Sequence, residues 1–399
     1  MTWPTRPISE VCSHVVDCVN RTAPIVDFET PYKMLRTTNV RGGFVDTENV
    51  RYVTLETYER WTRRLVPQRG DVFLTREAPL GDVGRLTSDD KVFLGQRLFH
   101  YRADPEKMDG RFLTYALQSS AVQGWIRGAG MGATVEHARV GDFHKIPVPV
   151  PPKEVQTTIG DTLSAYDDLI ENNRRRIALL EAAARMLYRE WFVHFRFPGH
   201  EHVKIIDGLP EGWERRMLGD VVDNVKDTVK PTDFSEDEIH IGLEHIPRRA
   251  FTLSDWEAAE DLASGKTRFE EGDILFCKIR PYFHKVGFTI RSGLASSDAL
   301  VWRVKEKEDW PLVVCATSSD HFVAVASKTV REGSKMPRAD WNVLKKYSLP
   351  KPLDGLLGVF NETILSITAQ CKALVLQNRA LAQARDLLLP RLMNGEIAV

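Results

Sequence analysis

The 399-residue sequence predicts an α+β fold in which two similar mixed α/β globular domains are separated by two long helices. We expect these helices to form an antiparallel coiled coil, which would make the molecule pseudo-two-fold symmetric. Three observations lead to this prediction: a short motif occurs twice, a proline-rich run closes each copy, and a long heptad pattern follows each proline run. The predicted segments are a globular domain at 1–152, a helical region at 153–195, a second globular domain at 196–348 and a second helical region at 349–399.

The composition is that of a folded globular protein, with 43% hydrophobic, 9% aromatic and 27% charged residues, and it excludes disordered and collagen-like chains. The sequence contains no run of roughly eighteen apolar residues, which is the length that a membrane helix needs. Because the first residues also lack a secretory apolar segment, we expect a cytoplasmic protein with no membrane partner. The five cysteines include no C-x-x-C pair, so we expect reduced thiols and neither a disulfide framework nor a zinc site.

The charge distribution is more informative than the net charge of −1, which by itself weakly disfavours a nucleic-acid partner. Residues 201–271 contain 9 basic and 18 acidic side chains, whereas residues 272–345 contain 12 basic and 8 acidic ones. An acidic segment followed by a basic one is compatible with a positive face that binds a polyanion. An evenly mixed, solvated surface is equally compatible with these sums.

The repeated motif predicts one buried strand in each globular domain. Each copy has a Gly-Asp pair, a short apolar run and then a basic residue, at 70–76 and again at 272–278. A Val-Gly pair follows in both copies, at 83–84 and 286–287. This order predicts a turn, a buried strand and a polar exit, in which Arg76 and Lys278 occupy equivalent positions.

Proline-rich runs mark the end of each globular domain, at 146–152 and 348–352. Proline lacks a backbone N–H and cannot continue a helix or a central strand. After each run the hydrophobic period changes to alternating steps of three and four residues, which is typical of coiled-coil helices. The two stripes are Ile159, Leu163, Tyr166, Ile170, Asn173, Ile177, Leu180, Ala184, Leu187 and Trp191, and then Phe360, Ile364, Ile367, Cys371, Leu374, Asn378, Leu381, Arg385, Leu388 and Leu392.

Each stripe contains one asparagine, and a polar residue on a heptad seam often sets the register. If the helices run antiparallel with Asn173 opposite Asn378, the remaining seam residues form layers, which would place Trp191 opposite Phe360. Two solvated asparagines on misphased stripes are the alternative. Pro390 is expected to limit the second helix, because its ring would clash with the preceding turn.

Fragments that resemble catalytic motifs are incomplete. Residues 264–267 end like a phosphate-binding loop but lack its first glycine, and the glycines at 128–132 follow a predicted helix where a dinucleotide turn needs a strand. The His-Glu-His triplet at 200–202 has no further histidine or cysteine nearby. No nuclease, hydrolase or amino-methyltransferase motif is visible, so we expect no catalytic residue and no metal site on this chain.

The order of segments resembles the specificity (S) subunit of type I restriction-modification systems. Two globular readers on long helices also suit duplex DNA, whose half-sites repeat about every 34 Å. The start of the chain departs from the family pattern, since no Leu-Pro-x-Gly-Trp precedes Ile8. The motifs that carry the resemblance are Gly208-Leu209-Pro210-Glu211-Gly212-Trp213, Ile241-Gly242-Leu243-Glu244-His245-Ile246, the 272–276 strand leading to Arg280-Pro281-Tyr282, Lys335-Met336-Pro337-Arg338-Ala339-Asp340-Trp341, the helix through Asp167 to Asn173, and the ending 387–397.

The resemblance implies that the globular domains are target-recognition domains, which read a bipartite sequence in double-stranded DNA. It also implies that the helices dock two methyltransferase (M) subunits and that restriction (R) subunits join the complex. Catalysis would then belong to these partners, so S-adenosylmethionine, ATP and Mg²⁺ are expected on them and no cofactor is expected on this chain.

Basic residues near the repeated strand are the candidate DNA contacts, because arginine and lysine donate hydrogen bonds to phosphates and guanine edges. A role in surface solubility alone is the competing interpretation. Two other functions also remain open: a coiled-coil adaptor with two protein-binding heads, and a self-contained restriction or modification enzyme. The candidates are Arg76 in the first domain and Lys278, Arg280, Lys285, Lys335 and Arg338 in the second.

Overall fold

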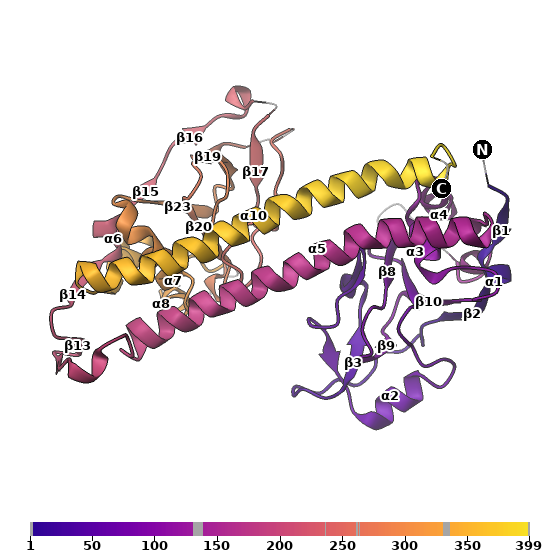
Figure 1. The fold of residues 1–399 in the computed structure, drawn as a ribbon, viewed down its shortest axis with the longest axis horizontal. Helices are drawn as coiled ribbons and strands as arrows, with labels where there is room; N and C mark the ends of the chain where they lie inside the picture. Colours follow the sequence, from indigo (N-terminus) through magenta and orange to yellow (C-terminus); the bar gives the residue numbers. More distant parts are fainter. Residues whose placement is uncertain are drawn as a thin grey trace. The chain divides into compact units, whose positions relative to one another are not determined.

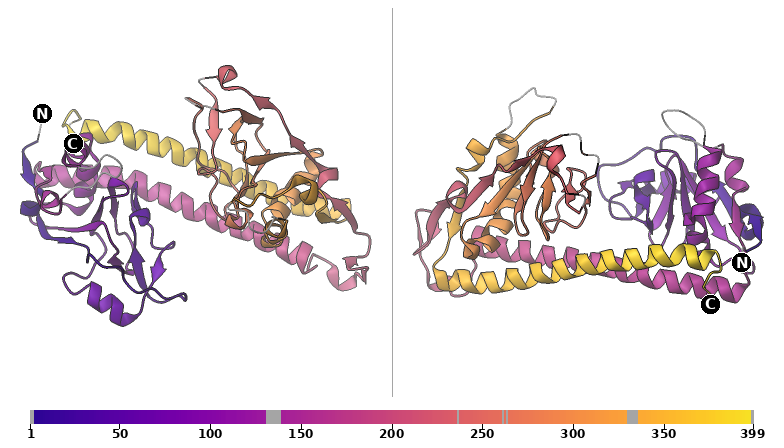
Figure 2. Two further views of the ribbon diagram at one scale, coloured as in Figure 1. Left: turned by 180° about the vertical axis from the view of Figure 1, so that it is seen from behind. Right: turned by 90° about the horizontal axis from the view of Figure 1, so that it is seen from above.

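The computed structural model describes residues 3–130, 139–235, 237–260, 262, 264–329 and 336–397. The chain forms two compact units, and both long helices contribute residues to each of them. Unit 1 comprises Met1–Glu171 and Arg379–Val399, and unit 2 comprises Asn172–Asn378. Figure 1 shows the order of the elements along the chain, and Figure 2 shows the same ribbon from two further sides.

Unit 1 is built around a six-stranded sheet with the strand order β2-β10-β7-β8-β5-β4. The motif strand β7 lies in the middle of this sheet and is buried along most of its length. The sheet strands are β2 (Cys12–Asp17), β10 (Leu98–Ala103), β7 (Val72–Arg76), β8 (Leu80–Arg85), β5 (Gly43–Val45) and β4 (Val40–Arg41). The remaining elements are β1 (Thr5–Pro7) paired with β11 (Pro147–Pro149), the sheet of β6 (Arg51–Tyr52), β3 (Tyr32–Leu35) and β9 (Lys91–Leu94), and the helices α1 (Ile8–Val11), α2 (Leu55–Trp61), α3 (Gly110–Gln118) and α4 (Ser120–Ala129).

Unit 2 repeats the central strands of unit 1 in a four-stranded sheet of order β15-β23-β20-β21. These strands are β15 (Val222–Val225), β23 (Ala299–Val304), β20 (Ile274–Cys277) and β21 (Val286–Phe288). A five-stranded sheet contains β16 (Thr228–Val229), β19 (Lys266–Phe269), β22 (Gly293–Ala295), β17 (Ile239–Ile241) and β18 (Glu257–Ala258). The other elements are β12 (Ile205–Ile206) with β13 (Leu209–Pro210), β14 (Glu214–Met217) with β24 (Ser348–Lys351), and the helices α6 (Leu218–Val221), α7 (Trp310–Thr317), α8 (Asp320–Lys328) and α9 (Trp341–Leu344).

The Gly-Asp turn before the motif strand has the same structure in both units. Gly70 and Gly272 have φ angles of +96° and +90°, a conformation that glycine adopts without the steric cost of a Cβ atom. The aspartate that follows is buried and pairs with an arginine on the neighbouring strand. Arg102 Nε and Nη2 lie 2.9 and 2.7 Å from the carboxylate of Asp71, and Arg303 makes the same two bonds to Asp273. These paired bonds fix the turn against the sheet.

Unit 1 adds a buried histidine to this pair. His100 Nε2 lies 2.6 Å from Asp71, and only 1% of the His100 side chain is exposed. Burial lowers the pKa of His100 and outweighs the opposing effect of the Asp71 carboxylate. Burial alone would raise the pKa of Asp71, but the hydrogen bonds from Arg102 and His100 reverse this and hold it below its usual range. The fold therefore favours a neutral imidazole beside an ionised carboxylate.

The folded protein is expected to lose stability as the pH falls through the ordinary histidine range. In the unfolded chain His100 binds a proton below about pH 6.5. In the folded protein its pKa is lowered, so the imidazole stays neutral to a lower pH. Between pH 7.5 and 5.5 this difference removes up to about 1.4 kcal/mol from the free energy of unfolding. Urea denaturation at both pH values checks the effect, and His100→Gln should show a smaller pH dependence than the unmodified chain. Equal losses for both proteins would contradict it.

The long helices are α5 (Lys153–Tyr188), which continues into a π-helical turn at Arg189–Val193, and α10 (Asp354–Met393). Within unit 2 they run antiparallel, and the rings of Trp191 and Phe360 lie 5.9 Å apart. Ala184, Ile364 and Cys371 join the same core. In unit 1, the opposite ends of the two helices bury Ile159 and Leu163 in the same cluster as Leu392 and Met393.

The prediction that Pro390 limits the second helix is wrong. Helix α10 continues through Pro390 to Met393, with Leu392 and Met393 only 2% and 5% exposed. A proline inside a helix costs about 3 kcal/mol, whereas burying a large apolar side chain contributes about 1.5–3 kcal/mol. Two buried side chains so close to the helix end offset the cost of the proline.

The structure also bears on membranes and on the thiols. No helix among the described residues is long and apolar enough to cross a membrane. All five cysteines are buried and unpaired. Burial raises the pKa of the Cys12 and Cys315 thiols to about 12, so these two thiols stay protonated and unreactive at neutral pH.

Candidate nucleic-acid interface

Unit 2 brings four of the predicted basic residues together at the end of strand β20. Two backbone hydrogen bonds join the segment after β20 to a second segment: Arg280 N donates to Pro337 O, and Ala339 N donates to Lys278 O, each at 2.8 Å. Lys285 lies just before β21, and its carbonyl accepts a hydrogen bond from Cys277 N at 2.9 Å. Lys278, Arg280, Lys285 and Arg338 therefore lie on two neighbouring segments joined by backbone hydrogen bonds, which together we call the unit-2 basic loop.

The side chains of this loop differ in how far they are already engaged. Lys278 Nζ donates to Ser297 O at 2.6 Å, and Lys285 Nζ donates to Leu243 O. Arg338 Nη2 lies 3.3 Å from Asp298 Oδ1. The guanidinium of Arg280 has no hydrogen-bond or carboxylate partner in the part of the chain that the structure describes. Arg280 is therefore the residue of this loop with the most donors free for a ligand.

An aromatic cluster beside the loop was not predicted from the sequence. Arg248 lies over the ring of Phe283 at 4.1 Å, and Arg280 approaches the same ring at 5.8 Å. Tyr282, which precedes Phe283, is 55% exposed. An arginine over an aromatic face is held by cation–π attraction, so Phe283 positions two guanidinium groups on one surface. Only the fold reveals this cluster, because Arg248 is distant from the loop in sequence.

The backbone of Arg280 has a counterpart in unit 1. Arg280 has a φ of +47° and precedes Pro281, and Ala78, at the equivalent place in unit 1, has a φ of +54° and precedes Pro79. Both residues have a positive φ before a proline, although the Ala78-Pro79 peptide bond is cis. Alanine adopts this positive φ in unit 1, and arginine adopts it in unit 2.

Unit 1 presents a different set of groups after its motif strand. Arg76 N donates to Arg97 O at 3.0 Å, and the Arg76 side chain has no polar partner among the described residues. Arg97 pairs with Glu77 at 3.4 Å. Asp82 precedes the Val83-Gly84 pair, at the place where Lys285 precedes Val286 in unit 2. The structure therefore leaves Arg76 as the predicted contact of unit 1 and gathers the other described candidates in unit 2. Lys335, the remaining candidate, lies outside the described residues.

The two seam asparagines are in direct contact within unit 2. Asn173 Nδ2 lies 3.0 Å from Asn378 Oδ1 and 3.0 Å from Gln377 Oε1, and Asn173 is only 3% exposed. The charged seam residue Arg385 pairs within unit 1 with Asp167, which also accepts a hydrogen bond from Tyr115 Oη at 2.6 Å. The polar positions of both stripes are thus satisfied inside the helix pair, and Asp167 is the partner that the seam pattern did not reveal.

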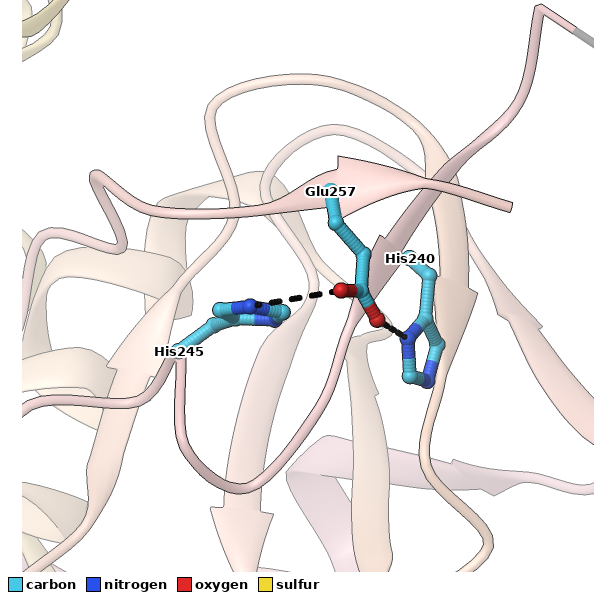
Figure 3. A group of neighbouring side chains, drawn as sticks. All are labelled: His240, His245 and Glu257. Atoms are coloured by element: carbon cyan, nitrogen blue, oxygen red, sulfur yellow. Dashed lines mark hydrogen bonds and ion pairs between the residues drawn. The ribbon is translucent and has the colours of Figure 1, made fainter. Parts of the chain in front are cut away.

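One group of possible metal ligands lies in unit 2, formed by His240, His245 and Glu257 (Figure 3). His240 Nδ1 is 2.8 Å from Glu257 Oε1, and His245 Nε2 is 4.0 Å from Glu257 Oε2. The hydrogen bond from His240 is the main cause that holds the pKa of Glu257 below its usual range. The sequence did not single out this group, and the His200–His202 triplet that it did single out forms a separate 3₁₀ helix.

The hydrogen bonds around this group fit a carboxylate-bridged histidine pair better than a metal site. Metal-bound histidines normally donate their second ring N–H to an oxygen acceptor. His245 Nδ1 instead accepts a hydrogen bond from Gly242 N at 3.0 Å, which places the ring proton of a neutral His245 on the nitrogen facing Glu257. His240 Nε2 is buried without a partner among the described residues. The group therefore ties β17 to β18 and to the segment after β17.

Comparison with known proteins gives one family. Residues 3–182 match the family described as the type I restriction modification DNA specificity domain. The chain is 27% identical over 176 residues to the specificity subunit of the type I restriction enzyme MjaIX from Methanocaldococcus jannaschii, covering 43% of this chain and 40% of that protein. It is 24% identical over 283 residues to the EcoDI specificity subunit from Escherichia coli, covering 63% and 61%. The matched part is thus less than two thirds of the length of either relative.

Two further comparisons cover nearly the whole chain. The MjaVIII specificity subunit of M. jannaschii is 22% identical over 373 residues, covering 89% of this chain and 86% of that protein. The crystal structure of a type I restriction-modification S subunit from M. genitalium superimposes with a TM-score of 0.59 at 17% identity, covering 98% and 96%. The structural match confirms the predicted fold class.

Proposed function

Because residues 3–182 match the type I restriction modification DNA specificity domain and the chain is similar to specificity subunits of type I restriction enzymes, we propose that it is such a subunit and that it reads a bipartite sequence in duplex DNA, one half with each unit. The observation that carries the proposal is the unit-2 basic loop, where the Arg280 guanidinium lies near Phe283 and has no hydrogen-bond or carboxylate partner among the described residues. Arginine donates two parallel hydrogen bonds to the O6 and N7 atoms of guanine. The repeated strand and turn in unit 1, with Arg76 at its end, support a second reader of the same design.

The chain acts as a non-catalytic subunit in this proposal. Its helices dock two methyltransferase subunits, and restriction subunits complete the assembly. The chemistry resides in those partners, so S-adenosylmethionine, ATP and Mg²⁺ bind to them and not to this chain. Both long helices carry exposed apolar side chains that are available for docking. They are Leu169, Leu179, Met186, Val359, Leu365, Leu376 and Leu387.

A coiled-coil adaptor with two protein-binding heads is not favoured. It would share the helices, but it gives no reason for basic residues to gather at the end of a repeated strand. It also differs in one measurable property, because an adaptor has no salt-dependent affinity for duplex DNA.

A test of the proposal is to co-express the chain with a candidate type I methyltransferase subunit from the same genome and to sequence the host DNA for methylated adenine. We expect a split motif to be methylated only when this chain is present. Arg76→Ala and Lys278→Ala should each change a different half of that motif, because the two residues occupy equivalent places in different units.

Two outcomes would overturn the proposal. One is methylation that does not depend on this chain. The other is a purified complex that binds no duplex DNA at any salt concentration, which would make the adaptor function the better explanation. Unfolding curves for both variants exclude the possibility that a lost half-site reflects a lost domain.

A further inference from the structure

Asp298 is an acidic residue that directly precedes strand β23 and contacts the unit-2 basic loop. Its carbonyl accepts a hydrogen bond from Lys278 N at 3.0 Å. Its carboxylate oxygen Oδ1 lies 3.3 Å from Arg338 Nη2 and 3.7 Å from Lys278 Nζ. The side chain is 30% exposed, and Oδ2 has no hydrogen-bond donor in the described part of the chain. Asp298 therefore contacts Lys278 and Arg338 through Oδ1, and its Oδ2 can accept a hydrogen bond from a ligand.

The fold itself does not require a carboxylate at this position. In unit 1 the equivalent residue is Arg97, which precedes strand β10 as Asp298 precedes β23, and Arg97 O accepts Arg76 N at 3.0 Å. The repeat keeps the buried Asp71 and Asp273 that hold the turn, but it reverses the charge at this exposed position. The two units share this backbone position but have opposite charges there. We therefore attribute the carboxylate of Asp298 to the ligand-binding surface of unit 2 and not to the stability of the fold.

A carboxylate on a surface that binds DNA weakens attraction to phosphates, so it opposes binding to unrelated sequences. It becomes favourable only where a hydrogen-bond donor faces it. In the major groove of duplex DNA these donors are the amino groups of cytosine N4 and adenine N6. Lysine and arginine beside it suit neighbouring acceptor atoms.

We infer that Asp298 is a specificity-determining residue of unit 2, which accepts a hydrogen bond from the amino group of a cytosine or adenine while it positions Lys278 and Arg338. This inference rests on the proposed function. It concerns one position in one half of the target, whereas the proposed function concerns the existence of a split target.

Asp298→Asn tests the inference in the complex of this chain with its methyltransferase. The asparagine side chain has the shape of aspartate but carries no charge, and its NH₂ group can donate a hydrogen bond. The variant should therefore also tolerate bases that present an acceptor atom at this position. We expect the unmodified complex to methylate a motif with cytosine or adenine at one position of one half, and the variant to methylate motifs with other bases there. Fluorescence anisotropy with labelled duplexes should show tighter binding to a random duplex. The preference for the cognate duplex should fall by about fivefold or more.

Asp223→Asn is the matched control, because Asp223 is a 69% exposed carboxylate of the same unit that pairs with Lys305 at 3.8 Å. It should leave the motif and the preference unchanged. An unaltered motif for Asp298→Asn, or equal gains in affinity for cognate and random duplexes, would show that Asp298 contributes only its charge and would overturn the inference. If the unmodified complex produced no split motif, the proposed function would be at fault.

Discussion

Replacing Asp71 with alanine is expected to lower the free energy of unfolding by about 3–5 kcal/mol. The substitution leaves Arg102 and His100 without the carboxylate that both contact at 2.6–2.9 Å. It also removes the acceptor for the backbone N–H of Gln68 at 2.8 Å, which shapes the turn before β7. Removing one partner of a buried ion pair costs this much because the remaining charge stays desolvated. Urea denaturation followed by circular dichroism measures the change.

Two comparisons make this result specific. Asp89→Ala removes an exposed aspartate of the same unit and should change the free energy of unfolding by less than about 0.5 kcal/mol. Asp273→Ala should cost less than Asp71→Ala, because the Arg303 side chain is 38% exposed and can regain water, whereas Arg102 is only 20% exposed. A loss below about 1 kcal/mol for Asp71→Ala would mean that the buried pair does not hold the turn.

Replacing Arg280 with alanine is expected to weaken binding to cognate duplex DNA by about 1–3 kcal/mol, roughly 5-fold to 150-fold, and to relax one half of the target. Its guanidinium lies 5.8 Å from the Phe283 ring centre and has no hydrogen-bond or carboxylate partner among the described residues, so the substitution breaks no internal hydrogen bond or ion pair of that side chain. The unfolding curve should not change. Ala78 has a similar positive φ at the equivalent place in unit 1, so we expect the Arg280→Ala variant to fold.

Arg248→Ala distinguishes a base contact from a general electrostatic effect. Arg248 lies over the same ring, with its guanidinium 4.1 Å from the Phe283 ring centre. If both residues act only through charge, the two variants should weaken cognate and random duplexes equally and reduce the salt dependence alike. If Arg280 reads a base, its variant should lose affinity mainly for the cognate duplex. Unchanged affinity of Arg280→Ala for the cognate duplex would remove this residue from the interface.

The sequence determined those features that depend on local order along the chain. The repeated Gly-Asp motif predicted the two equivalent strands β7 and β20, since a turn followed by a short apolar run is typical of a buried strand. The steps of three and four residues predicted the two long helices. The place of one asparagine in each stripe predicted their opposition, and the structure places Asn173 next to Asn378.

The tertiary structure decided which distant residues meet, because side chains far apart in sequence carry no mark of their partners. Arg102 and Arg303 became the partners of the motif aspartates only through the pairing of neighbouring strands. Arg248 lies beside Phe283 where a backbone hydrogen bond joins Arg249 N to His284 O at 2.9 Å. Pro390 gave a misleading local signal, because the burial of Leu392 and Met393 offsets its cost. Asp298 is the clearest case: the sequence shows only another acidic residue, and its place between Lys278 and Arg338 exists only because the fold brings three segments together.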